Sequence, residues 1–132
     1  MALSNGSGGY QVGDGNLNAP VFSTLTVPTA YTATATLTTA DLASGLIIYT
    51  SASTGNMTLP TAALTDAAFS SAKTGSSFDL ALVTTSTGVP TIVVGTGWTL
   101  ASTSGAGVAS KSVLFRAVKT GDAAYSLYRI AG

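Results

Sequence analysis

Short β-type runs separated by turn residues constrain the fold of this chain more than any other feature of its sequence. Apolar or β-branched runs alternate with Gly, Pro, Asp or Ser, and turn signals recur at intervals of roughly 8 to 12 residues. This spacing predicts an all-β domain of about eight short strands, a β-sandwich or jelly roll, with a closed barrel as the alternative. We find no internal repeat at a fixed period, which disfavours a solenoid or a propeller.

The first strands are predicted from the alternation of their side chains. Residues 31–37 carry Tyr31 and Leu37 on one face and threonines on the other, which predicts a half-buried strand. Residues 46–51 are typical of a buried strand. We expect residues 56–59 to pair with it across a small turn at 53–55, because Gly55 tolerates a positive φ.

Two segments favour helix. Residues 39–45 predict a short helical turn, with an acidic residue near its start and Gly45 as a left-handed stop. Residues 61–73 predict one short helix, because Leu64 and Phe69 recur at helical spacing within an Ala-rich stretch.

The second half of the chain predicts strands alone. Residues 78–83, 91–94 and 98–100 are expected to be extended. The C-terminal hairpin is expected at 113–130, where Val113, Phe115 and Ala117 share one face and residues 119–122 form the turn.

Residues 1–19 differ in composition from everything that follows. They contain glycine at 6, 8, 9, 13 and 15 and almost no apolar side chains, so they bury too little surface to offset the cost of ordering. We therefore expect a flexible N-terminal arm at 1–19 and a β-sandwich domain at 20–132, a length that fits one core.

Charge is scarce and balanced. The chain has 5 basic and 5 acidic residues, 8% of the total, against about 25% in an ordinary soluble domain. We expect part of the surface to be covered by protein partners. Five scattered basic residues argue against nucleic-acid binding, and no apolar run approaches the ~20 residues that a membrane-spanning helix needs.

The start of the chain lacks a secretory signal pattern, and the absence of cysteine suits a reducing cytoplasm.

The side chains that usually carry catalysis are missing. The chain has no His, Cys or Glu, and its five Asp residues fall in different predicted elements. Residues 70–73 and 105–112 resemble a serine-enzyme motif and a P-loop, but neither has the required context. Asp14, Asn16 and Asn18 resemble the start of a calcium loop, which Ala19 and Leu25 then break. We expect no enzyme, no cofactor, no metal site and no small-molecule substrate.

Candidate partner-binding residues lie mainly in the arm. Tyr10 stands alone in a polar segment, and buried aromatic residues dominate binding energies. Phe22 and Trp98 flank predicted strands, so core membership is the alternative for both. The full candidate set is Tyr10, Gln11, Asn16, Leu17, Asn18, Phe22 and Trp98.

Several segments carry a family resemblance: GYQVGDGNLN in the arm, LIIYTS and NMTLP, then SFDLALV, TIVVGTGW, VLFRAV and YSLYRI. Together they resemble small β-sandwich modules of tailed-phage virions, namely capsid decoration or cement proteins and fibre or knob domains. The resemblance implies a structural protein without enzymatic activity that forms a homotrimer on a capsid lattice. It also implies that the N-terminal arm, or one end of the sandwich, binds major capsid protein. It implies a place on the capsid surface of the virion, and in the host cytoplasm during assembly.

A fibre module that binds a receptor or carbohydrate is the alternative. Sandwiches with exposed aromatic residues are common scaffolds for sugar stacking, and Trp98 or the tyrosines would stack on the rings. An exposed Trp98 would favour this alternative, and a buried Trp98 would count against it.

Overall fold

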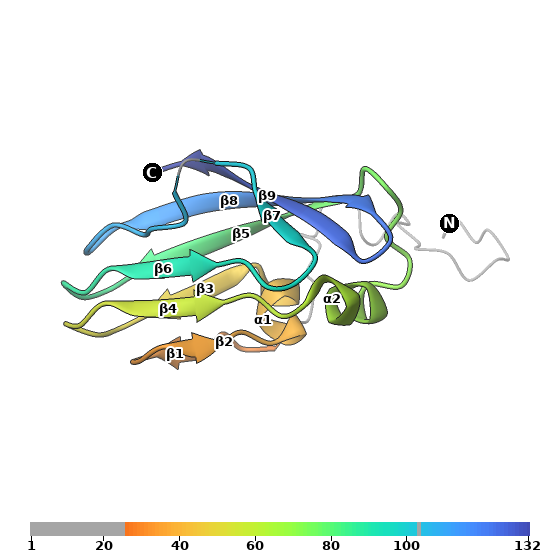
Figure 1. The fold of residues 1–132 in the computed structure, drawn as a ribbon. Helices are drawn as coiled ribbons and strands as arrows, with labels where there is room; N and C mark the ends of the chain where they lie inside the picture. The colour runs from red at the N-terminus through yellow and green to blue at the C-terminus, as the bar shows by residue number, and fades with distance from the viewer. Residues whose placement is uncertain (1–25, 103) are drawn as a thin grey trace, which may run out of the picture.

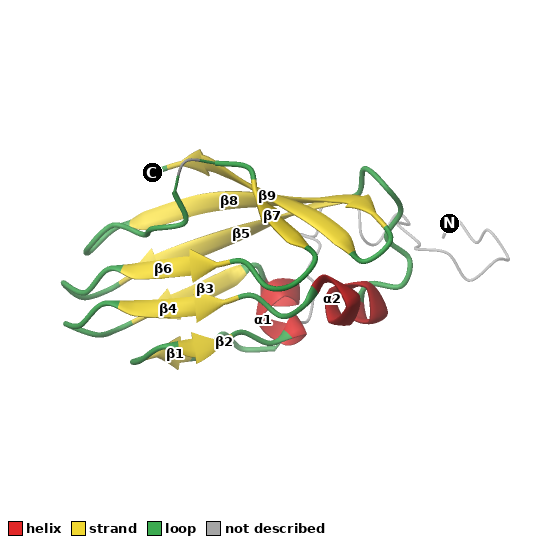
Figure 2. Ribbon diagram, viewed as in Figure 1, coloured by secondary structure: helices red, strands yellow, loops and turns green. Residues whose placement is uncertain are grey.

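A computed structural model describes residues 26–102 and 104–132. The predicted arm at 1–19, with Tyr10, Gln11, Asn16, Leu17 and Asn18, lies outside these residues, as does Phe22. The described part is mostly β, which agrees with the predicted all-β class. Nine strands form a six-stranded sheet, in the order β1-β3-β5-β8-β9-β7, and a three-stranded sheet, in the order β2-β4-β6 (Figures 1 and 2). In chain order the elements are β1 (Ala30–Tyr31), β2 (Ala35–Thr36), α1 (Thr39–Ser44), β3 (Leu46–Tyr49), β4 (Gly55–Thr58), α2 (Ala62–Ala68), β5 (Ser77–Thr84), β6 (Pro90–Val93), β7 (Trp98–Leu100), β8 (Ser112–Gly121) and β9 (Ala124–Ala131).

The first six strands alternate between the two sheets. Strands β1, β3 and β5 pair in parallel in the larger sheet, and β2, β4 and β6 pair in parallel in the smaller one. The chain therefore makes three stacked coils, each with one strand in each sheet, and the coils are visible as tiers in Figure 1. This solenoid-like path over residues 30–93 corrects the expectation that disfavoured a solenoid.

The coils are stacked in register although their lengths differ. Ala30, Ile48 and Val83 are register partners, so equivalent positions lie 18 and then 35 residues apart. The second interval is longer because it includes α2 and the loop after it. No fixed period exists in the sequence, which is why the stacking left no repeat to detect.

One predicted strand and one predicted strand pairing are wrong. The predicted strand at 31–37 is divided into β1 and β2, which lie in different sheets, and β4 does not pair with β3. The connection at 50–54 crosses from one sheet to the other instead of making a hairpin. The Tyr49 hydroxyl donates to the Ser53 carbonyl oxygen at 2.9 Å, and Gly55 leaves room for the Tyr49 ring.

The two described helices have local causes. Thr38 caps α1 by accepting from the Asp41 backbone N–H, Asp41 accepts in return from the Thr38 backbone N–H, and Gly45 ends the helix at a φ of 69°. The predicted helical turn is thus a six-residue helix. Thr61 caps α2, which lies inside the predicted 61–73, so the described fold has two helices where the predicted fold class had one.

The C-terminal hairpin is confirmed. Strand β8 pairs antiparallel with β9, and Val113, Phe115 and Ala117 are buried as expected. The turn is shorter than predicted, because it is confined to Asp122 and Ala123. Ala123 adopts a φ of 48° there.

One core connects the layers. The inner face of the six-stranded sheet packs against the three-stranded sheet at one end and against α1 and α2 at the other (Figure 1). The core side chains of the described part are Leu37, Leu42, Ile47, Tyr49, Met57, Leu59, Ala62, Leu80, Leu82, Ile92, Trp98, Val113, Phe115, Ala117, Tyr125 and Leu127. No helix within residues 26–102 or 104–132 is long and apolar enough to cross a membrane.

Candidate protein-binding surfaces

Trp98 belongs to the core. Its side chain is 7% exposed, its Nε1 donates to the Pro60 carbonyl oxygen at 2.9 Å, and its ring stacks on Tyr125 with centroids 4.9 Å apart. Of the predicted partner-binding residues it is the one that the structure describes. Its burial supports core membership and counts against a sugar-stacking role.

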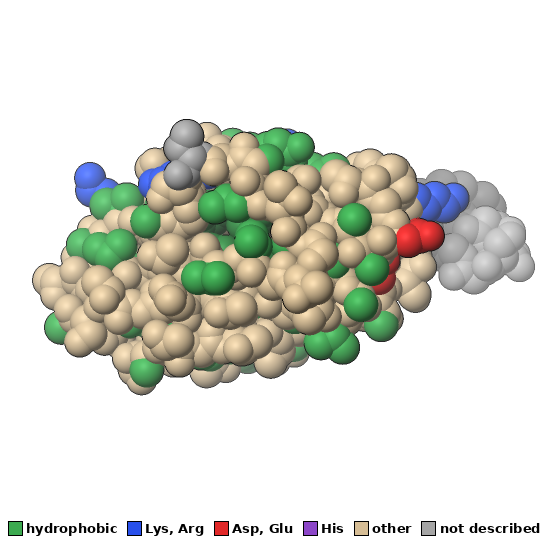
Figure 3. All heavy atoms as spheres, viewed as in Figure 1, with side chains coloured by type: hydrophobic (Ala, Val, Ile, Leu, Met, Phe, Trp, Pro, Cys, Tyr) green, Lys and Arg blue, Asp and Glu red, His purple; other side chains and the backbone are tan. Residues whose placement is uncertain are grey.

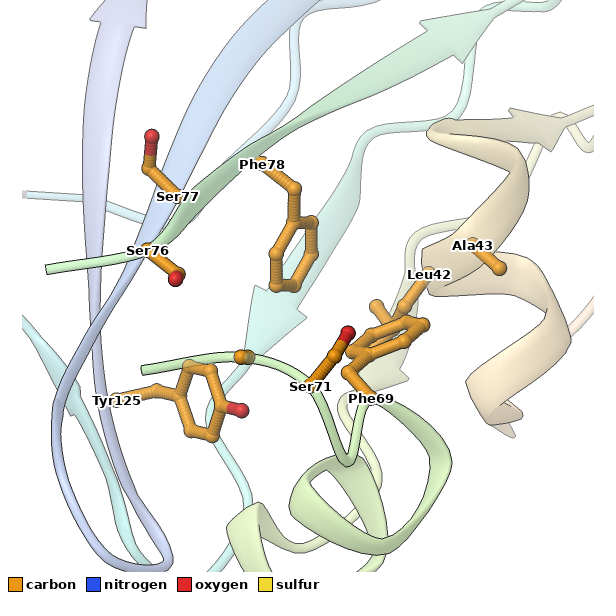
Figure 4. Close-up of a pocket in the computed structure, with 9 residues that line it drawn as sticks. Leu42, Ala43, Phe69, Ser71, Ser76, Ser77, Phe78 and Tyr125 are labelled. Atoms are coloured by element: carbon orange, nitrogen blue, oxygen red, sulfur yellow. The ribbon is translucent and has the colours of Figure 1, made fainter. Parts of the chain in front are cut away.

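A pocket opens beside this aromatic cluster, at the end of the molecule where the helices lie (Figure 4). Its volume is about 480 Å³. Phe69 and Phe78 meet edge to face at 5.5 Å within it, and Tyr125 closes one side. The lining residues are Leu42, Ala43, Phe69, Ser71, Ala72, Ser76, Ser77, Phe78 and Tyr125.

The side chains that line this pocket are suited to binding a ligand and not to catalysis. It offers aromatic and aliphatic walls with three serine hydroxyls and no charged side chain. Nucleophilic catalysis needs a base within hydrogen-bond reach of the hydroxyl, and the lining provides none. The pocket can therefore hold an apolar group with a few hydrogen bonds at its rim.

Asp66, on α2, lies at the centre of a polar cluster beneath the hairpin. Its carboxylate accepts from the Tyr125 hydroxyl at 2.6 Å and from the Ala123 backbone N–H at 2.6 Å, and it pairs with Lys119 Nζ at 2.8 Å. The hydrogen bonds from Lys119, Tyr125 and Ala123 lower the pKa of Asp66 to about 2. Burial, with the bond to Asp66, raises the pKa of Tyr125.

These shifts argue against proton transfer by the cluster. A general acid or base works best with a pKa near the operating pH, and both groups move away from neutrality. Lys119 is also buried against this carboxylate. The cluster instead fastens α2 to the hairpin of β8 and β9. No group of three or more possible metal-ligating side chains occurs in the described residues.

The outer face of the six-stranded sheet carries more apolar side chains than that of the three-stranded sheet. Strands β3, β5, β8 and β9 alternate between buried residues and residues that face outward. Where one face of a sheet meets water, the outward residues are normally polar. Here the apolar outward residues, which we call the outer apolar face, are Leu46, Ile48, Ala81, Val83, Leu114, Val118, Tyr128 and Ile130. The polar outward residues of the same strands are Ser77, Asp79, Ser112, Arg116, Thr120 and Ser126.

Exposure confirms that this face is open. Tyr128 is 39% exposed and Ile130 is 52% exposed, and the other members are half-buried. Both helices pack on the opposite, inner side, where Leu42 of α1 and Ala62 of α2 join the core. No described helix or strand covers the outer apolar face.

The charged side chains amid this face neutralise each other. Arg116 Nε donates to Asp79 Oδ1 at 2.8 Å, and its second nitrogen contacts Oδ2 at 3.4 Å. The hydrogen bond from Arg116 lowers the pKa of Asp79, which keeps the carboxylate ionised. The outer face of the six-stranded sheet therefore carries apolar side chains and hydroxyl groups around one ion pair.

The outer face of the three-stranded sheet is more polar than that of the six-stranded sheet. Its outward residues are hydroxyl or amide side chains in most positions, namely Thr36, Asn56, Thr58, Thr91 and Val93. Figure 3, which views the molecule from this side, shows scattered hydrophobic atoms and charged groups near the two ends. This surface has the composition of an ordinary solvated face.

Comparison with known proteins found no family model, no curated protein and no solved structure that matches this chain.

The outer apolar face had a signal in the sequence. Residues 46–49 and 80–83 are apolar at both alternating positions, a pattern typical of strands covered on both sides. The sequence alone does not separate a strand covered within its own chain from one covered by a partner.

Proposed function

We propose that this chain is a structural virion protein of a tailed phage, a capsid decoration or cement subunit that binds and bridges major capsid protein as a homotrimer. The phage assignment rests on the sequence resemblance described above. The structural observation that supports an association role is the outer apolar face on a chain with only ten charged residues. Exposed apolar patches of this kind mark protein–protein contacts.

The proposed mechanism is mechanical. Subunits bridge neighbouring capsid proteins, and modest contacts add up because the lattice holds binding sites at high effective concentration. In this proposal the two sheets are the two layers of a β-sandwich whose first six strands pair in parallel within their sheets. The subunit is placed on the capsid surface, after assembly in the host cytoplasm, and needs no cofactor, nucleic acid, membrane or small-molecule substrate.

The test is binding to capsids assembled from the major capsid protein of the same phage without their decoration subunit. We expect saturable binding at fixed lattice positions, visible by electron cryomicroscopy, and capsids that resist heat better when occupied. Absence of binding at micromolar subunit concentration would reject the proposal.

A fibre or receptor-binding tip is the second candidate, because the pocket of Figure 4 has aromatic walls and a serine rim. Binding of soluble host glycans by this subunit, together with failure to bind capsids, would favour it. The burial of Trp98 removes the side chain that would have been the best sugar platform.

A further inference from the structure

The outer apolar face is continuous across strands. Ile48 and Val83 are register partners on β3 and β5, and Ala81 and Leu114 are partners on β5 and β8. Tyr128 of β9 lies opposite Arg116 of β8. Cross-strand neighbours lie about 5 Å apart, so these side chains form one surface instead of isolated exposed residues.

This surface is large enough to form a substantial part of a subunit interface. The four strands that carry it, β3, β5, β8 and β9, span roughly 14 Å at ~4.8 Å spacing, and eight residues of strand span roughly 27 Å, which gives about 400 Å² in projection. The accessible area is larger, because the side chains stand above the sheet. A standard-size interface buries about 800 Å² on each partner.

The chemistry of the face points to another copy of itself. Interfaces between identical subunits are more apolar than other interfaces and have few charges at their centre. A partner with a strong charge of either sign would find no countercharge here, since Asp79 and Arg116 satisfy each other at 2.8 Å. A second copy of the same surface matches the aliphatic groups. It can also place its own Arg116 near the first copy's Asp79, so that like charges need not meet.

We propose that the outer apolar face binds the same face of another copy of this chain and is the subunit interface of the homo-oligomer. The trimeric stoichiometry rests on the proposed function, whereas the location of the interface rests on the face itself. In a closed trimer the three faces turn toward the three-fold axis, so that each face meets those of its two neighbours and is removed from water. The polar face of the three-stranded sheet then remains outside.

The experiment compares two double variants of the full chain by sedimentation at micromolar concentration. Val83→Lys with Ile130→Lys puts two charges on the outer apolar face, on β5 and β9, with β8 between them. Thr36→Lys with Val93→Lys is the matched control: it puts two charges on the outer face of the other sheet, on β2 and β6, with β4 between them. We expect the wild type and the control to be oligomers. The face variant should be a folded monomer, with a dissociation constant raised at least about tenfold.

A second pair of variants covers the possibility that the lysine variant does not fold. Tyr128→Ser and Ile130→Ser change side chains that are already exposed in the single chain, so each should fold and still weaken association about tenfold. A monomeric wild type at high micromolar concentration, or serine variants that associate as tightly as the wild type, would overturn the inference. Capsid binding is measured in parallel, so that the two proposals can fail separately. A monomeric wild type that binds capsids would refute this inference and leave the proposed function standing. An oligomeric wild type that does not bind capsids would refute only the proposed function.

Discussion

The Tyr125 hydroxyl donates to Oδ1 of Asp66 at 2.6 Å, across 59 residues of chain. This contact joins α2, in the connection between the second and third coils, to the start of β9. The same carboxylate pairs with Lys119 near the end of β8, so the half-buried Asp66 connects the coils to the hairpin. The Tyr125 ring in turn stacks on Trp98, which places the polar cluster directly beside the aromatic core.

The Asp66 cluster should make stability depend on pH in acid. The pKa of Asp66 is about 2 in the folded chain, below its ordinary value near 4, so its contribution is complete above about pH 4 and is lost as pH falls toward 2. Asp66→Asn should lower the melting temperature at pH 7, and its deficit relative to wild type should shrink between about pH 4 and pH 2. Asp122→Asn, in the exposed hairpin turn, is the control. A deficit that stays constant across this window would contradict the assignment.

The stacked coils predict a steric requirement at Gly88. Its backbone N–H donates to the Ser51 carbonyl oxygen at 2.8 Å, and a Cβ there would clash with the carbonyl oxygens of Ser51 and Ser53 on the neighbouring coil. Gly88→Ala should therefore destabilise the chain by about 1–3 kcal/mol. Gly121→Ala is the control, because its Cβ would meet nothing closer than Ala124 Cβ at 3.9 Å and should change stability by less than about 0.5 kcal/mol. Equal urea midpoints for the two variants would refute the stacking.

Local features of the sequence predicted the local parts of the fold. The hairpin of β8 and β9 follows from alternation around a tight turn, and α1 follows from Asp41 near its start and Gly45 after its end. The coils were missed because the corner at 50–54 has the composition of a hairpin turn. Turn residues show where the chain reverses, but they do not show whether the next strand joins the same sheet.

Trp98 shows how far the candidate binding site could be predicted from the sequence. A tryptophan beside a strand fits both a core and an interface, and only the partners of its ring, Tyr125 and Phe78, decide between them. The outer apolar face was hidden for a similar reason. Strands such as 80–83 are apolar on both sides, and the side that lacks an internal partner depends on contacts distant in sequence.

Trp98→Ala should therefore act on stability and not on recognition. Removing a buried aromatic side chain costs about 3–5 kcal/mol, and Pro60 would also lose its hydrogen-bond donor. Denaturant unfolding of the variant, followed by circular dichroism because the only tryptophan is gone, measures the loss. At a temperature where the variant is still folded, its self-association should equal that of wild type. A folded variant that fails to associate would return Trp98 to the list of interface residues.

Deletion of residues 1–19 should reduce attachment to the capsid while leaving the domain intact. The core side chains of the described part all lie at or after Leu37, and the first described strand begins at Ala30, so the truncated chain keeps every contact seen here. We expect its melting temperature to change by less than about 2 °C. Capsid occupancy should fall, because Tyr10 and Leu17 are the side chains of this segment best able to bury apolar area on a partner. The measurement pairs thermal melts with occupancy on capsids assembled without their decoration subunit, and sedimentation shows whether self-association survives. Truncation that unfolds the domain would show that residues 1–19 belong to the fold. Unchanged occupancy would place attachment elsewhere, with the pocket beside Phe69 and Phe78 as the next surface to mutate.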